Sequence, residues 1–207
     1  MKIALCLSGQ PRSVKQGYEF VKRNILDGND VTVFCQVWQS PEASDVEIYK
    51  PEVVIMEQSL SNDLSKYTNV PPPQPNWKVK DPARSTWNQL YAIKVCNDFK
   101  KAYENHNNMK FDWVIRSRYD FAINVKIPFS ELDNSKLYIP DEGNDQFAFG
   151  SQDNLVKHMA TFKHIDEYYN NGTPFIGEAL QRANHKHYGL DRVLTYFDIH
   201  HPFGPGF

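Results

Sequence analysis

Short apolar runs alternate with one amphipathic stretch in the first 57 residues, and this alternation restricts the fold more than any other feature of the sequence. Three runs have the length and the apolar character of buried strands: residues 2–7, 31–38 and 52–57. Residues 14–26, between the first two runs, carry apolar side chains near helical spacing. The order strand, helix, strand, short connection, strand predicts a parallel sheet with helices packed on its faces.

The rest of the chain extends this pattern. Further strands are predicted at residues 111–115, 136–140, 146–151 and 192–201, and helices at residues 83–104, 151–172 and 176–187. Five prolines in residues 69–82 exclude a helix there and predict a stiff surface loop near the site. The fold class is therefore α/β, a Rossmann-like, mixed and mainly parallel sheet with helices on both faces. We expect residues 1–207 to form one domain of a longer chain, because the sequence stops within the loop "PFGPGF".

Charge and cysteine content exclude several classes of protein. The formal net charge is −2, so the chain as a whole is not built to bind nucleic acid or another polyanion. No run approaches the ~20 apolar residues that a membrane span needs. Cys6, Cys35 and Cys96 each lie in an apolar run, which is typical of buried free thiols in a reducing compartment. We therefore expect a cytoplasmic protein without a membrane span.

The loop after the first strand is the first candidate site. Residues 8–12, "SGQPR", lie at the carboxyl end of that strand, where open α/β sheets bind ligands. Gly9 allows backbone amides to approach a ligand, and Ser8 and Gln10 supply neutral hydrogen bonds. Arg12 can fork onto a phosphate. The segment is neither GxGxxG nor a Walker loop, so it does not indicate a dinucleotide dehydrogenase or a P-loop NTPase. An ordinary tight turn with a surface arginine is the alternative.

The segment "FDWVIRSRYDFAIN", residues 111–124, places charged residues directly after a buried strand. If the strand alternates, Arg116, Arg118 and Asp120 point to one side. Two guanidinium groups beside Asp120 keep its carboxylate ionised, and such a carboxylate can hold a hard divalent cation. The arginines can also neutralise a leaving diphosphate. A structural arginine–aspartate pair that closes the strand is the alternative.

Carboxylates and histidines later in the chain supply further candidates. Asp145 borders an apolar run and is the best candidate among the acids of the turn at residues 141–146. Glu178 stands near a predicted helix start, where a glutamate more often serves the helix dipole. His201, at the end of the last strand, can ligate a metal, although a structural or exposed histidine is more common. The histidines on predicted helices are expected at the surface: His158, His164, His185 and His187.

These features together resemble GT-A glycosyltransferases, which bind a nucleotide-sugar and a divalent metal through a "DxD" motif. The corresponding triplet here is Arg118-Tyr119-Asp120, a DxD-like motif in which arginine replaces the first acid. The replacement leaves Asp120 to hold the metal and removes the usual ribose contact. Residues 201–204, "HPFG", resemble the carboxyl-terminal histidine motif of the retaining, glycogenin-like members. The lysine that normally follows is absent, since Phe207 stands there.

Three segments carry a closer resemblance to small glycosyltransferases of large DNA viruses: "KIALCLSGQPR", "ARSTWNQLYAIKVCNDFK" and "DWVIRSRYDFAIN". They are similar to the amino-terminal domains of chlorovirus enzymes that decorate the glycans of the major capsid protein. The resemblance implies a GT-A-like fold and a metal-dependent hexosyl transfer with retention, in the host cytoplasm. The donor would be a UDP-sugar, and the acceptor would be a glycan or a glycoprotein such as the viral capsid protein.

The resemblance also assigns roles to individual residues. The nucleotide-sugar would be bound by Ser8, Gly9, Gln10, Arg12, Arg84, Ser85, Asn88 and Arg116. Asp120 and His201 would hold the metal, with Mn²⁺ as the first choice and Mg²⁺ as the second. Catalysis would fall to Asp145 and Glu178, facing the sugar or the acceptor, and to Arg118, facing the leaving diphosphate.

Two other classes of function fit parts of the same pattern. A metal-dependent nucleotidyltransferase would use a similar loop and carboxylate, but it normally needs two or three acids clustered on the metal. A non-catalytic carbohydrate-binding module would use the aromatic residues, 14% of the chain, as stacking platforms. Such a module predicts neither tight nucleotide binding nor metal dependence.

Overall fold

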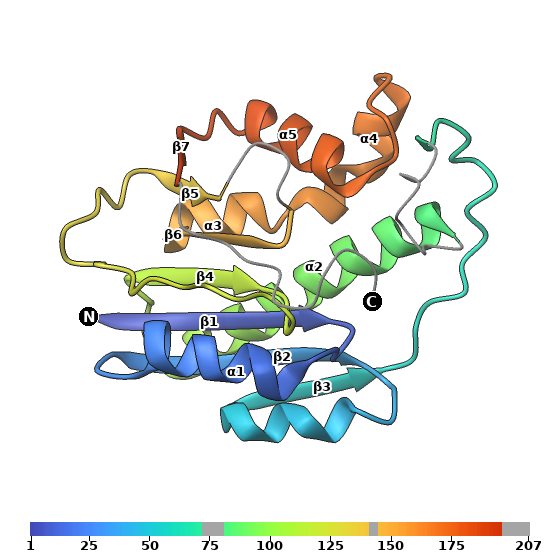
Figure 1. Cartoon of the computed structure of the whole chain (residues 1–207). Coiled ribbons are helices and arrows are strands. Elements are labelled where there is room, and N and C mark those ends of the chain that lie inside the picture. Colours follow the sequence, from blue (N-terminus) through green and yellow to red (C-terminus); the bar gives the residue numbers. More distant parts are fainter. Residues whose placement is uncertain (72–80, 141–144, 196–207) are drawn as a thin grey trace.

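The chain folds around a seven-stranded sheet in the computed structural model, which describes residues 1–71, 81–140 and 145–195 (Figure 1). The strands are β1 (Lys2–Gly9), β2 (Asp30–Trp38), β3 (Val53–Glu57), β4 (Trp113–Ser117), β5 (Leu137–Ile139), β6 (Phe147–Ser151) and β7 (Arg192–Leu194). Their spatial order is β3-β2-β1-β4-β6-β5-β7, and β6 is the one described strand that runs antiparallel to its neighbours. The predicted strands are confirmed in position. The last is observed only over residues 192–194, and its predicted end lies outside the described residues.

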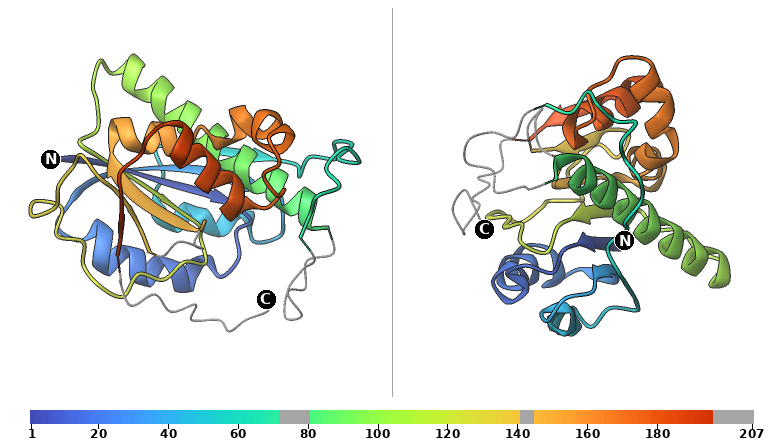
Figure 2. Two further views of the ribbon diagram at one scale, coloured as in Figure 1. Left: turned by 90° about the horizontal axis from the view of Figure 1, so that it is seen from above. Right: turned by 90° about the vertical axis from the view of Figure 1, so that its right-hand side faces the viewer.

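Helices cover both faces of this sheet, as Figure 2 shows from two further directions. One face carries α1 (Val14–Val21), a π-helical turn (Lys22–Leu26) and a 3-10 helix (Ala43–Tyr49). The other carries α2 (Pro82–His106), α3 (Gln152–His158), a second 3-10 helix (Thr161–His164), α4 (Ile165–Asn170) and α5 (Gly177–His187). The expected fold class is confirmed as α/β with a mixed, mainly parallel sheet, and this arrangement is consistent with a Rossmann-like fold. No described helix combines the length and apolar character needed to cross a membrane.

The prediction of one continuous helix over residues 151–172 is wrong. The chain forms three short helical pieces there, and the first of them ends at His158. The hydroxyl of Thr161, the first residue of the next piece, donates to the carbonyl oxygen of His158 (2.9 Å), a position that a backbone N–H would take in a continuing helix. The break turns the chain so that Ile165 and Tyr168 of α4 reach the apolar core on the α2 face.

The start of α2 brings a long helix to the carboxyl edge of the sheet. Asp81 caps the helix by accepting the backbone N–H of Arg84 (2.9 Å), and Pro82 occupies the first helical position. From there α2 runs back across β1 and β2 and buries Leu90 and Ile93 against the sheet. Its first turns therefore lie at the same edge as the loops that follow β1 and β4.

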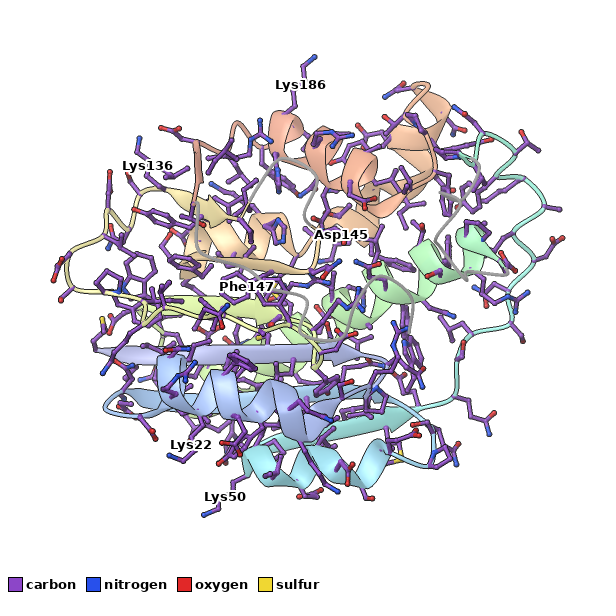
Figure 3. All side chains as sticks on the ribbon, in the orientation of Figure 1. Lys22, Lys50, Lys136, Asp145, Phe147 and Lys186 are labelled. Atoms are coloured by element: carbon purple, nitrogen blue, oxygen red, sulfur yellow. The ribbon has the colours of Figure 1, made fainter. Side chains whose placement is uncertain are left out.

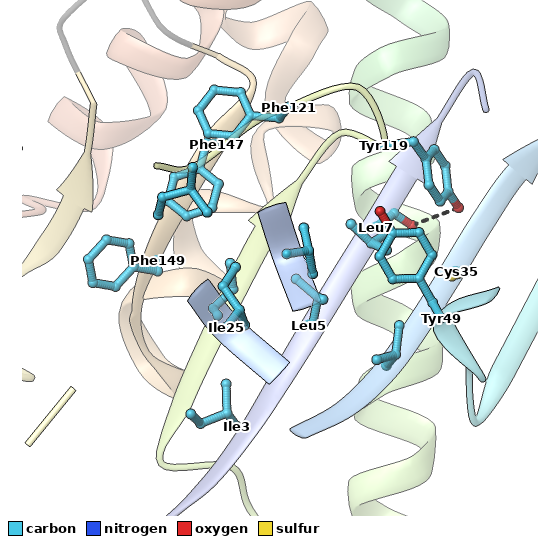
Figure 4. Packing of buried hydrophobic residues seen from close by; sticks show 14 of the residues in the cluster. Ile3, Leu5, Leu7, Ile25, Cys35, Tyr49, Tyr119, Phe121, Phe147 and Phe149 are labelled. Atoms are coloured by element: carbon cyan, nitrogen blue, oxygen red, sulfur yellow. Dashed lines mark hydrogen bonds between the residues drawn. The ribbon is translucent and has the colours of Figure 1, made fainter. Parts of the chain in front are cut away.

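A loop, rather than a helix, covers the α1 face over β4, β6 and β5. Residues 119–132 supply its buried side chains, including Tyr119, Phe121 and Phe129. Phe121 stacks on Phe147 of β6 (Figure 4), and their ring centroids are 4.9 Å apart. This packing explains why apolar chain resumes directly after the charged residues that follow β4.

Candidate functional site

The order in which strands are added to the sheet reverses between β1 and β4. The chain proceeds from β1 outward through β2 to β3, then returns to place β4 on the other side of β1. Loops at the carboxyl ends of two such strands diverge, and ligands of open α/β sheets bind in the crevice between them. The two loops here are residues 9–12, which begin at the last residue of β1, and residues 118–124, which follow β4.

Gly9 sets the direction of the first loop. Its φ of +109° belongs to the region that favours glycine, and no atom lies within 4 Å of the position that a Cβ would take. The Gly9 N–H donates to the side-chain oxygen of Gln36 in β2 (3.2 Å). Ser8 is buried, and its hydroxyl has no hydrogen-bond partner within the described parts of the chain. Buried polar groups are rarely left unpaired, so this hydroxyl marks a place where a ligand could supply the partner.

Tyr119 anchors the second loop. Its ring is fully buried on the α1 face, and its hydroxyl donates to the carbonyl oxygen of Gln36 (2.9 Å). The carbonyl oxygen of Leu7 lies 3.3 Å from the same hydroxyl (Figure 4). Because Tyr119 points into the core, its neighbours Arg118 and Asp120 remain at the edge, with 26% and 18% of their side chains exposed.

Three charged side chains from the two loops meet at this edge. Arg118 donates from Nε and Nη2 to the two carboxylate oxygens of Asp120, at 2.9 and 2.6 Å. Arg12 approaches the same carboxylate from the first loop, with Nε 3.9 Å from Oδ2. Burial lowers the pKa of Arg12, the charge of Arg118 lowers it further, and Asp120 partly offsets both. Two arginines on one carboxylate leave a local positive charge that suits an anionic ligand.

Arg116, which is predicted to point to the same side as Arg118 and Asp120, donates to a different acceptor. Arg116 is fully buried and donates from Nη1 to the backbone carbonyl oxygen of Asp145, just before β6. Its Nε and Nη2 have no partner among the described residues. Burial lowers the pKa of Arg116 to about 10, so the group stays charged at neutral pH. A buried cation with free donors is costly unless an anion or a polar ligand completes it.

Asp145 and Glu178 form a second acidic group at the same edge. Figure 3 shows Asp145 between α2 and α5. Gln89 of α2 donates to its carboxylate oxygen (2.7 Å), and a Cβ at Gly177 of α5 would stand 2.3 Å from that oxygen. Burial, followed by the negative charge of Asp145, raises the pKa of Glu178 to about 7. A carboxyl group that titrates near neutral pH beside a fixed carboxylate can accept or release a proton under physiological conditions.

The three predicted nucleotide contacts on α2 lie in its first two turns. The Nε of Arg84 pairs with Asp81 (3.0 Å), and Ser85 is exposed. Asn88 is buried and donates to the Ser59 hydroxyl (2.7 Å). Its side-chain oxygen has no partner in the described chain. The three residues stand at the carboxyl edge, and their contact with a nucleotide stays a prediction.

The described residues alone do not make a metal site. Asp120 is the predicted ligand among them, and both of its oxygens already accept from Arg118. No cluster of three or more histidine, cysteine, aspartate or glutamate side chains in the described ranges is placed to hold an ion. His201 and the segment 201–204 lie outside those ranges, as do residues 141–144 of the acidic turn.

No protein-family model matches this chain. No curated protein sequence is significantly similar to it either. The site is therefore interpreted from its own geometry.

Two histidines expected at the surface are buried instead. His158 of α3 and His185 of α5 face each other, with Nδ1 and Nε2 2.8 Å apart. Burial lowers the pKa of both rings, that of His185 to about 4, so the pair is neutral at physiological pH. His158 is the last residue of α3 and His185 lies within α5, so each ring is buried by contact between two helices, which neither segment reveals by its own sequence.

Proposed function

We propose that the chain is a glycosyltransferase that moves a sugar from a nucleoside diphosphate, UDP in preference, to a hydroxyl group of a glycan or glycoprotein. One observation supports this most directly: Arg12, Arg118 and Asp120 meet across the switch point between β1 and β4. This crevice is where an open α/β sheet binds a nucleotide, and its net positive charge suits a diphosphate. The GT-A-like assignment, the retaining outcome and the viral capsid acceptor rest on the sequence resemblance and belong to the same proposal.

The chemistry follows from the charges at the edge. The bond between the anomeric carbon and the diphosphate oxygen breaks, and negative charge builds on the leaving group. Arg12 and Arg118 neutralise that charge, because a guanidinium forks onto phosphate oxygens. The acceptor hydroxyl forms the new bond to the anomeric carbon and gives up its proton. Glu178 in its ionised form is one recipient, and the departing diphosphate is the other in a front-face mechanism.

A divalent metal, Mn²⁺ or Mg²⁺, remains part of the proposal through Asp120 and His201. A bound metal would supply further charge neutralisation on the diphosphate. Since Arg118 holds both oxygens of Asp120, metal binding at Asp120 has to compete with this pair. A dependence of nucleotide affinity on Mn²⁺ that is lost in Asp120→Ala would support the metal role.

Calorimetric titration with UDP- and GDP-sugars, with and without Mn²⁺, tests the proposal. We expect Arg12→Gln and Arg118→Gln to weaken nucleotide binding about tenfold or more, because each removes charge-assisted hydrogen bonds. Arg23→Gln is the matched control, since Arg23 is exposed in the π-helical turn and lies over the Phe20 ring. Heat from free glycans and none from nucleotides would replace the proposal with a carbohydrate-binding module.

A further inference from the structure

A partly buried hydrogen-bonded chain runs from the loop after β1 to α2 and involves none of the residues proposed above except Gly9. Its members are Gly9, Gln36, Glu57 and Tyr91. They come from β1, β2, β3 and α2, and each link crosses from one element to another.

Gln36 is the centre of this chain. It lies in β2, opposite Ser8 of β1, and it is 0% exposed. Its oxygen accepts the Gly9 N–H (3.2 Å), and its nitrogen donates to Glu57 (3.2 Å). The oxygen and the nitrogen of the Gln36 amide therefore both make hydrogen bonds. The orientation of the amide is fixed, because Gly9 needs an acceptor and Glu57 needs a donor.

Glu57 and Tyr91 secure the far end. Glu57 is the last residue of β3, and its second carboxylate oxygen accepts the Tyr91 hydroxyl (3.1 Å). The Tyr91 ring stacks on Trp38 of β2, with centroids 6.0 Å apart and planes within 21°. This stacking keeps the hydroxyl in place, so the orientation of Glu57, and through it that of Gln36, is set by α2.

This hydrogen-bonded chain acts on a loop in which Pro11 is the one buried side chain. Gly9 takes a left-handed conformation that other residues adopt only with strain, and the space where a Cβ would stand is open. Gln10 and Arg12 beyond it are exposed. The direction of the Gly9 N–H decides where the following backbone leads, and hence where Arg12 meets Asp120.

We propose that Gln36, Glu57 and Tyr91 are positioning residues that hold the loop of residues 9–12 in its anion-binding conformation. The inference rests on the proposed nucleotide site. The three side chains need not touch the nucleotide, and they act by presenting the Gly9 backbone and the Arg12 guanidinium.

An exchange of the two central residues tests this. At a pH high enough to ionise both carboxyl groups, Gln36→Glu alone sets two carboxylates against each other, and we expect UDP binding to weaken about tenfold. Adding Glu57→Gln restores a donor between the two positions. The carboxylate now at position 36 can accept from Gly9 and from the amide at position 57, and the oxygen of that amide can accept from Tyr91. We expect the double variant to return to within about threefold of the original affinity. Gln16→Glu, on the exposed side of α1, adds the same charge away from the chain and serves as control.

A second readout separates this inference from the proposed function. Hydrogen exchange of the Gly9 amide, followed by NMR without nucleotide, should quicken about tenfold in Gln36→Glu and recover in the double variant. Absence of UDP binding in the unaltered protein would rule out the proposed function. The exchange rate of the Gly9 amide would still test whether the hydrogen-bonded chain holds the loop. Normal UDP binding by Gln36→Glu, or a double variant as weak as the single one, would overturn the inference.

Tyr91→Phe covers the case in which Gln36→Glu does not fold. It removes one hydroxyl at the far end of the chain and leaves the ring on Trp38. We expect UDP binding to weaken about threefold and Gly9 exchange to quicken, because Glu57 loses one of the two groups that hold it. Unchanged affinity and unchanged exchange in this variant would equally overturn the inference.

Discussion

At the scale of single residues, the carboxyl edge carries two kinds of charge side by side. Arg12 and Arg118 outnumber Asp120 in one group, which favours an anion. Asp145 and Glu178 form the other, in which burial and like charge favour one proton between two carboxylates. A reaction that releases a diphosphate and deprotonates a hydroxyl needs both kinds of group within one crevice.

The raised pKa of Glu178 predicts how stability depends on pH. The folded chain binds a proton at Glu178 up to about pH 7, whereas the ordinary pKa is 4.5. Folding therefore takes up a proton between these values, and the contribution of Glu178 to stability falls as pH rises through this window. Glu178→Gln removes the ionisation, so we expect it to raise the unfolding midpoint at pH 8 relative to the original chain, and less so at pH 5.

Thermal unfolding at the two pH values measures this difference. Glu131→Gln is the control, because Glu131 is exposed in the loop before β5. Equal effects of Glu178→Gln at pH 5 and pH 8 would contradict a raised pKa. Comparing the variant with the original chain at each pH cancels the opposite contribution of His158 and His185, whose lowered pKa values reduce stability as pH falls below 6.5.

At the scale of elements, α1 positions the loop after β4. Gly17 of α1 lies against the Tyr119 backbone, where a Cβ would stand 1.9 Å from the carbonyl oxygen. Asn24, in the π-helical turn that continues α1, donates to the Ile123 carbonyl oxygen. Two contacts from one helical segment thus hold both ends of the stretch that contains Asp120.

Gly17→Ala should therefore destabilise the protein and disturb the site together. In an exposed helix the same change would stabilise by roughly 1 kcal/mol, but here the methyl group meets a backbone that cannot rotate away. We expect a loss of about 1–3 kcal/mol in urea unfolding, and weaker UDP binding at a temperature where the variant is folded. Gln16→Ala, one position earlier and exposed, should leave both unchanged. Full stability of Gly17→Ala would show that α1 and the loop move apart freely.

Some of the helices and strands are predictable from the sequence, and others are not. Strands β1, β2 and β4 and helix α2 follow from runs and periodicities that each lie within one segment, so their positions are predictable. The end of the helix after β6 at His158 is not, because the Thr161 side chain takes the carbonyl oxygen of His158, and periodicity does not reveal such a hydrogen bond.

The candidate site also has parts that the sequence predicts and parts that it does not. The sequence predicts the loops that carry Arg12 and Asp120, since each follows a recognisable strand. It does not reveal that Gln36 and Gln89 hold Gly9 and Asp145, because those contacts join residues of different elements. A glutamine in the buried end of an apolar strand is the one available signal for Gln36.

At the scale of the whole molecule, β1 joins the two halves of the sheet. It pairs in parallel with β2 along Lys2–Gly9 and with β4 along Ile3–Leu7. The proposed anion-binding site lies where these halves meet, and α2 packs against β1 and β2 while Gln89 reaches Asp145 beside β6. Neither half completes its core or the site alone, so the described chain should unfold as one unit.

Two tryptophans can report on the halves separately. Trp38 lies in β2 and Trp113 in β4, and both are buried. In each of two variants that retain one of them as the single tryptophan, we expect the urea midpoint from fluorescence to match the midpoint from circular dichroism. Adding UDP at about 100 times its dissociation constant should raise the urea midpoints of both variants equally. One binding site at that concentration stabilises the folded state by about 2.7 kcal/mol. Because the ligand would bridge Arg12 and Arg118, a shift confined to one reporter would mean that the nucleotide binds one half of the sheet and that β1 does not couple the two.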